Sequence, residues 1–91
     1  MSIEDWRARI DEIDKKLVDM LNERFKCTNE IGKIKHAMNM RVYDPDREQA
    51  ILARIREHNQ GPLDDQAIQR LFERIFDEAR RLERIVSERG K

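Results

Sequence analysis

The sequence predicts an all-α fold of three helices per chain, one long, one short and one medium, assembled as a helical homodimer. Apolar residues recur at helical spacing in three stretches that turn-forming residues separate. Charged residues make up 42% of the chain and aromatic residues only 5%, with three glycines and two prolines, a composition typical of long helices. The length of 91 residues suits one domain, residues 1–91, and its small core would benefit from oligomerisation.

The longest predicted helix begins after Ser2, a suitable N-cap, and ends near Met38 or Asn39. Its apolar seam follows the 3–4 alternation of a heptad and consists of Ile3, Trp6, Ile10, Ile13, Leu17, Met20, Cys27, Ile31, Ile34 and Met38. Such a helix is about 50 Å long, whereas a compact domain of this size has a radius of gyration of about 12 Å. The remaining residues cannot cover it, so we expect a second copy of the chain to pack against it.

The second predicted helix runs from Asp46 to about His58. Asp44 followed by Pro45 is a strong start signal, because an aspartate caps the first turn and proline fits the first helical position. The sequence Asn-Gln-Gly-Pro at residues 59–62 then ends the helix with turn-forming residues.

The third predicted helix is capped by Asp64 and is followed by a tail, Ser87 to Lys91, that we expect to fray. Its apolar stripe consists of Ile68, Leu71, Phe72, Ile75, Phe76, Ala79, Leu82 and Val86. The stripe predicts one face packed against the other helices.

Composition argues against several classes of function. Basic and acidic residues number 19 each, and the resulting net charge of zero argues against a nucleic-acid binder. The single Cys27 cannot form an internal disulfide, and its place on the seam suggests a small buried side chain. His36 and His58 are isolated and no cofactor motif is present, so we expect neither a metal nor a cofactor. A charged N-terminus and short apolar runs predict a cytoplasmic protein without a membrane span.

Four charged residues fall on faces that should be apolar. Arg24 occupies a seam position, and Lys35 lies eleven residues later, so both point the same way from the first helix, about 16 Å apart. Glu48 and Glu83 interrupt the stripes of the other two helices. From spacing alone, three readings stay open: a polar ligand pocket, a buried ion network that only specifies packing, or charges that are simply exposed.

Four segments then carry a resemblance to a known family. They are residues 6–14, with the pattern R-x-x-I-D-x-I-D, residues 21–24, with L-x-x-R, residues 30–35, with I-G-x-x-K, and residues 42–48, with D-x-x-R-E. Together and in this order they resemble the all-helical (AroQ-class) chorismate mutases, and the resemblance covers nearly the whole chain. It implies an intertwined dimer and the conversion of chorismate to prephenate in phenylalanine and tyrosine biosynthesis, without a cofactor.

The resemblance also implies roles for individual side chains. Arg24 is similar to the arginine that binds a substrate carboxylate, and Arg7 to the arginine that reaches into the partner's site. Lys35 is similar to the lysine at the breaking ether oxygen. Seventeen residues separate Arg7 from Arg24, about 25 Å along one helix, so both can serve one site only if Arg7 comes from an antiparallel second copy.

Further site residues follow from the same resemblance. Glu48, with Asp44 and Arg47 nearby, resembles the group around the substrate hydroxyl. Ala79 stands where some members have a serine, so that contact is lost or passes to a backbone group. Glu83 stands where many members have a glutamine that donates to the ether oxygen, although fungal members have glutamate. An ionised glutamate cannot donate a hydrogen bond, so this role requires a protonated Glu83.

Two other functions remain open on the sequence. A related helical fold cleaves isochorismate to salicylate and pyruvate, and a substrate assay separates the two activities. The chain could also be a non-catalytic helical dimerisation module with a structural ion network.

Overall fold

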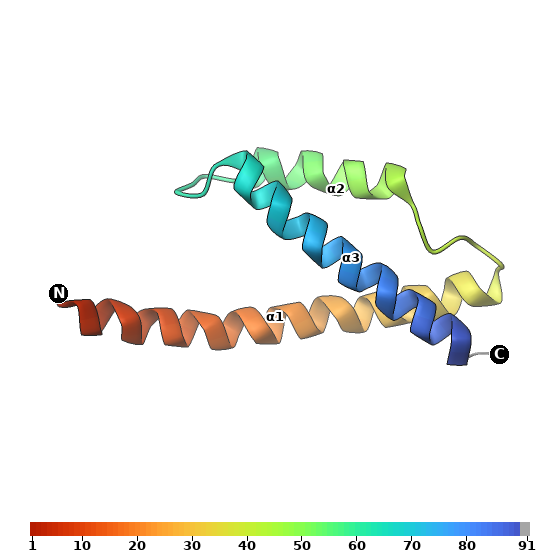
Figure 1. The fold of residues 1–91 in the computed structure, drawn as a ribbon, viewed down its shortest axis with the longest axis horizontal. Helices are drawn as coiled ribbons and strands as arrows, with labels where there is room; N and C mark the ends of the chain where they lie inside the picture. The colour runs from red at the N-terminus through yellow and green to blue at the C-terminus, as the bar shows by residue number, and fades with distance from the viewer. Residues whose placement is uncertain (90–91) are drawn as a thin grey trace.

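A computed structural model describes residues 1–89 and contains three helices in this range: α1 (Ile3–Ala37), α2 (Pro45–His58) and α3 (Asp65–Arg89) (Figure 1). They span 35, 14 and 25 residues, which confirms the predicted all-α fold with one long, one short and one medium helix. The chain measures 54 × 25 × 15 Å and has a radius of gyration of 16.3 Å, which shows an extended shape. The shape is extended because α1 is longer than the rest of the chain can cover.

The predicted start of α1 is confirmed, because Ser2 and Asp5 form a reciprocal capping box. The Asp5 N–H donates to Ser2 Oγ at 3.2 Å, and the Ser2 N–H donates to Asp5 Oδ2 at 3.0 Å. The helix ends at Ala37, one residue before the predicted Met38, and Asn39 has a φ of 55°. Asparagine tolerates this left-handed conformation, which turns the chain toward α2.

The predicted start of α2 is also confirmed. Asp44 Oδ1 accepts a hydrogen bond from the Arg47 N–H at 3.1 Å, and Pro45 is the first residue of the helix. The helix ends at His58, and the turn that follows places Gly61 at a φ of 80°, a conformation that favours glycine.

The cap of α3 lies at the predicted residue, where Asp64 Oδ1 accepts from the Ala67 N–H at 2.7 Å. The helix continues to Arg89, so the prediction that the chain frays from Ser87 is wrong for residues 87–89. Ser87 Oγ forms a hydrogen bond of 3.1 Å with His36 Nδ1, which joins this end of α3 to α1. Gly90 and Lys91, the rest of the predicted tail, lie outside the described residues.

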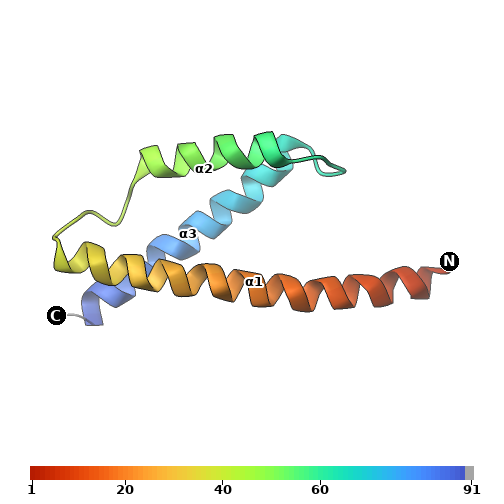
Figure 2. The ribbon, with the colours of Figure 1, turned by 180° about the vertical axis from the view of Figure 1, so that it is seen from behind.

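The helix α3 is the common support of the other two. It crosses α1 and packs against α2, whereas the backbones of α1 and α2 lie apart within residues 1–89 (Figures 1 and 2). Leu52 of α2 and Phe76 of α3 are the buried apolar residues of this small core, and Thr28 and Glu83 are the buried polar ones. The helices α1 and α2 are therefore separated from each other and joined through α3.

The apolar seam of α1 remains largely exposed in a single chain. Trp6, Ile10 and Leu17 are each 53% exposed, and Ile34 is 57% exposed. Packing within one chain does not bury this stripe, which matches the sequence argument for a second copy. None of the helices in residues 1–89 has both the length and the hydrophobicity that a membrane span requires.

Candidate active site

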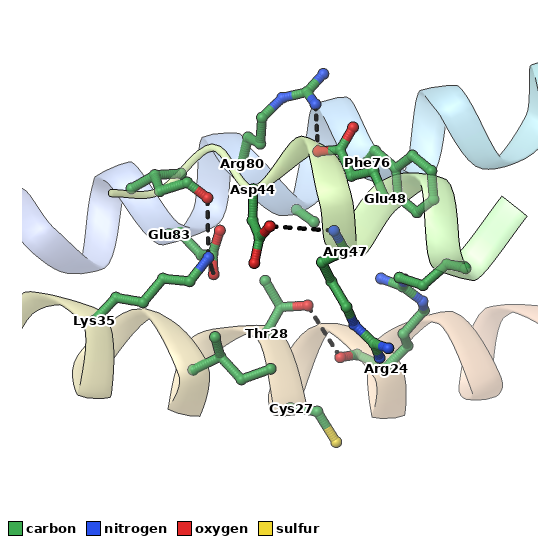
Figure 3. Close-up of a pocket in the computed structure, with 14 residues that line it drawn as sticks. Arg24, Cys27, Thr28, Lys35, Asp44, Arg47, Glu48, Phe76, Arg80 and Glu83 are labelled. Atoms are coloured by element: carbon green, nitrogen blue, oxygen red, sulfur yellow. Dashed lines mark hydrogen bonds and ion pairs between the residues drawn. The ribbon is translucent and has the colours of Figure 1, made fainter. Parts of the chain in front are cut away.

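A cavity of about 410 Å³ lies between α1, α2 and α3 (Figure 3). The segment that connects α1 to α2 closes one end of it. Its walls combine charged and apolar side chains, as ligand sites commonly do. The residues that line it are Arg24, Cys27, Thr28, Ile31, Lys35, Val42, Asp44, Arg47, Glu48, Ile51, Phe76, Ala79, Arg80 and Glu83.

The helix α1 presents Arg24 and Thr28 to the cavity from successive turns. Thr28 Oγ1 donates to the Arg24 carbonyl at 3.3 Å, so the buried hydroxyl is satisfied within the helix. The Arg24 guanidinium lies 6.0 Å from the centre of the Phe76 ring. Burial lowers the pKa of Arg24 from its usual value, and the positive charge of Arg47 lowers it further. The positive charges of Arg24 and Arg47 therefore act on each other at one end of the cavity (Figure 3).

Lys35 and Glu83 form a buried ion pair at the other end of the cavity. Lys35 Nζ lies 3.1 Å from Glu83 Oε1 and also donates to the Val42 carbonyl at 2.9 Å. The two side chains are 14% and 8% exposed. These values exclude the reading in which the charges are simply exposed, since buried charges need partners.

Gly32 allows α1 and α3 to approach each other beside this ion pair. A Cβ at Gly32 would lie 3.2 Å from the Glu83 Cα and 3.5 Å from the Val86 Cβ. Glycine therefore permits close packing of the two helices here, with Glu83 within reach of Lys35.

The first turn of α2 supplies the acidic wall of the cavity. Asp44 caps the helix, and Glu48 Oε2 accepts a hydrogen bond from Arg80 Nη1 of α3 at 2.5 Å. Arg80 also pairs with Asp77, and its guanidinium lies 5.3 Å from the centre of the Tyr43 ring. The hydrogen bond with Glu48 is the main cause that raises the pKa of Arg80.

Sequence reasoning missed Arg80. One signal was present: Arg80 precedes Glu83 by three residues and follows Phe76 by four, so it shares their side of α3. Apart from this spacing, the local pattern did not distinguish it from the exposed arginines of this charge-rich helix.

The structure brings seven of the eight predicted site residues to this one cavity. They are Arg24, Lys35, Asp44, Arg47, Glu48, Ala79 and Glu83. Arg7 does not reach it within one chain: its side chain is 66% exposed and pairs with Glu4 at 3.4 Å near the start of α1. The expectation of a buried Cys27 is wrong for the single chain, where the thiol is exposed and borders the cavity.

The charges of the lining favour an anionic ligand. Four basic residues, Arg24, Lys35, Arg47 and Arg80, face three acidic ones, Asp44, Glu48 and Glu83. Lys35 and Arg80 are engaged in ion pairs, whereas within residues 1–89 no carboxylate lies within 4.0 Å of the Arg24 or Arg47 guanidinium. Guanidinium groups bind carboxylates through paired hydrogen bonds. In the same residues no group of three or more His, Cys, Asp and Glu side chains is arranged to hold a metal ion.

Fold and site together define a small all-α domain with a cavity for an anionic small molecule. The model of the family chorismate mutase type II matches residues 6–84, and the chain therefore belongs to this family.

Two solved structures resemble the chain over almost its whole length. Chorismate mutase (form II) of Thermus thermophilus is 33% identical and superposes with a TM-score of 0.88, covering 90% of this chain and 93% of that one. Chorismate mutase of Helicobacter pylori in complex with prephenate is 28% identical with a TM-score of 0.87, covering 94% and 93%.

Among curated proteins, a bifunctional chorismate mutase/prephenate dehydratase of Neisseria gonorrhoeae is 41% identical over 78 residues. The match covers 86% of this chain and 21% of that protein. The chain thus spans about a fifth of the length of the bifunctional relatives that it matches.

Proposed function

We propose that residues 1–91 form a chorismate mutase domain that rearranges chorismate to prephenate. The observation that carries the proposal is the cavity itself. Within the described residues 1–89 it holds two guanidinium groups without a carboxylate partner, Arg24 and Arg47, opposite the buried pair of Lys35 and Glu83. A dianionic substrate placed between these ends meets cations for its carboxylates and polar groups at its reacting ether oxygen. The related protein of Helicobacter pylori, whose structure contains prephenate, supports the same ligand class.

We further propose that the working unit is an intertwined homodimer. The exposed seam of α1 and the 54 Å length of the chain support this arrangement, because a second antiparallel α1 would bury the stripe. Arg7 lies about 25 Å along α1 from Arg24 of the same chain and so cannot reach that chain's cavity. An antiparallel partner would bring its own Arg7 there instead. Each dimer then has two equivalent sites, each completed by the other chain.

Binding selects the reactive shape of the substrate. In the reaction one C–O bond breaks while one C–C bond forms, and the electrons move within the substrate, so no protein atom bonds to it. Arg24, Arg47 and the partner copy's Arg7 hold the two carboxylates and so favour the folded, chair-like conformer. Glu48, on the opposite wall, accepts a hydrogen bond from the substrate hydroxyl. Ala79 presents no polar side-chain atom, so it contributes shape alone.

Electrostatic stabilisation acts at the ether oxygen, where negative charge develops. Lys35 donates to this oxygen from its position beside the Val42 carbonyl. Glu83 adds a second hydrogen bond when it carries a proton. Gly32 leaves room for α3 to lie against α1, which places Lys35 and Glu83 side by side before substrate arrives.

One assay tests the proposal. The purified chain is incubated with chorismate, the loss of chorismate is followed by absorbance, and the product is identified. Formation of prephenate is the expected result. Production of salicylate and pyruvate from isochorismate, without prephenate from chorismate, would instead assign the lyase activity. If neither reaction occurs and a transition-state analogue leaves the melting temperature unchanged, the chain is a dimerisation module.

A further inference from the structure

Arg80 lines the cavity but has no place in the roles that the family resemblance implies. It is one-fifth exposed and pairs with Glu48 (Figure 3). It also contacts Asp77 and Tyr43. Building on the proposed function, we propose that Arg80 is a positioning residue. It fixes the Glu48 carboxylate on the cavity wall and offsets its negative charge, so that a dianionic substrate can bind with its hydroxyl against Glu48.

Arg80 is placed to support the first turn of α2. Within residues 1–89 the backbone of α2 packs against that of α3 and lies apart from that of α1, so α3 supplies the backing for this turn. Arg80 reaches this turn from α3 through Glu48, and its guanidinium also covers the Tyr43 ring, which directly precedes the N-cap. One side chain therefore anchors both the start of α2 and the segment before it.

The ion pair of Arg80 and Glu48 also has a defined geometry. The side chains of Arg80 and Glu48 are 21% and 20% exposed, so their ion pair is far better shielded from water than a surface pair. Within the described residues, Arg80 Nη1 engages Glu48 Oε2, and Nη2 engages the more exposed Asp77. The planar guanidinium is thus held from outside by Asp77. The other Glu48 oxygen, Oε1, stays available to accept a hydrogen bond from the substrate hydroxyl.

Arg80 also offsets the charge of Glu48. The Glu48 carboxylate accepts hydrogen bonds, but its negative charge repels a substrate that carries two carboxylates. With Arg80, basic side chains exceed acidic ones in the lining by one. Without Arg80, the two kinds would be equal in number and Glu48 would face the ligand uncompensated. We therefore expect the loss of Arg80 to act through Glu48, mainly on substrate binding.

The test is a double-mutant cycle measured as kcat and KM for chorismate. Arg80→Met should lower kcat/KM about tenfold to a hundredfold, chiefly by raising KM, because it removes a hydrogen bond to a charged group. Arg80→Lys, which keeps the charge but not the planar fork, should recover part of the loss. In a Glu48→Gln background, where there is no charge to offset, Arg80→Met should change kcat/KM by no more than about twofold. Arg81→Met removes an exposed neighbour and serves as the matched control.

Two results would contradict the positioning role of Arg80. If Arg80→Met costs as much in the Glu48→Gln background as in wild type, Arg80 does not act through Glu48 and the inference is wrong. It is equally wrong if Arg80→Met matches the Arg81→Met control. Should Arg80→Met fail to fold, as judged by thermal unfolding, Arg80→Lys is compared in both backgrounds under the same criterion. A wild-type chain that leaves chorismate unchanged contradicts the proposed function itself, whereas an active wild type with an insensitive Arg80 contradicts this inference alone.

Discussion

Gly32 lies where α1 crosses α3 beside the Lys35–Glu83 pair, and replacing it by alanine tests how closely the helices must approach. The added Cβ would lie 3.2 Å from the Glu83 Cα and 3.4 Å from its Cγ, so the neighbour would have to yield by a few tenths of an ångström. The atom it meets belongs to a helical backbone, so all of α3 near Glu83 has to move.

Two opposing terms set the magnitude for Gly32→Ala. Overpacking a close contact costs about 1–3 kcal/mol, whereas alanine in a helix gains about 1 kcal/mol over glycine. The free energy of unfolding should therefore fall by about 0–2 kcal/mol. Activity should suffer more, because displacing Glu83 misplaces a group at the reacting oxygen. An error of about 1 Å costs about a hundredfold, so a shift of a few tenths of an ångström should lower kcat/KM about tenfold.

The assay combines denaturant unfolding with steady-state turnover of chorismate. Lys33→Ala is the matched control, since Lys33 follows Gly32 in α1 but pairs with Glu30 on the exposed side of the helix. The control should stay within about 0.5 kcal/mol of wild type. A Gly32→Ala variant that is more stable than wild type and fully active would refute the argument that close packing at Gly32 places Glu83.

Three further predictions concern the candidate site. Lys35→Ala should lower kcat/KM about 100- to 1,000-fold, because it removes an electrostatic donor worth ~2.7–4 kcal/mol. Glu83→Gln should retain activity because an amide can donate the hydrogen bond to the ether oxygen, whereas Glu83→Ala should lower kcat/KM because it removes the donor. Arg7→Ala and Arg24→Ala should each be inactive alone, but subunits mixed after unfolding and refolding should recover about a quarter of the wild-type activity, because half the dimers are mixed and each has one intact site.

The contrary results are equally specific. A Lys35→Ala enzyme with kcat/KM near wild type would remove Lys35 from the site. An inactive Glu83→Gln variant would remove the hydrogen-bond donor role of Glu83. Mixed Arg7→Ala and Arg24→Ala chains that stay inactive, although size measurements show dimers, would contradict a site shared between two copies.

The sequence alone determined the helices and half of the residues that line the cavity. Caps at Ser2, Asp44 and Asp64 placed the three helix starts within one residue, because these signals are local and depend on the backbone next to them. The ends of α1 and α2 were placed within one or two residues, whereas α3 continues past its predicted end. Charges that interrupt an apolar stripe, such as Arg24 and Glu83, could be recognised for the same reason: their own helix predicts an apolar side chain there.

Only the tertiary structure decided which of these charges meet. Arg80 lies 32 residues from Glu48, and their pairing depends on how α3 packs against the start of α2, which no local pattern encodes. The contact of Gly32 with Glu83 and the hydrogen bond that joins Ser87 to His36 likewise depend on the crossing of α1 and α3. From sequence alone, Arg80 is predicted to be one more exposed arginine on a charged helix. Its burial and its acidic partners come from a second helix, and they make it part of the site.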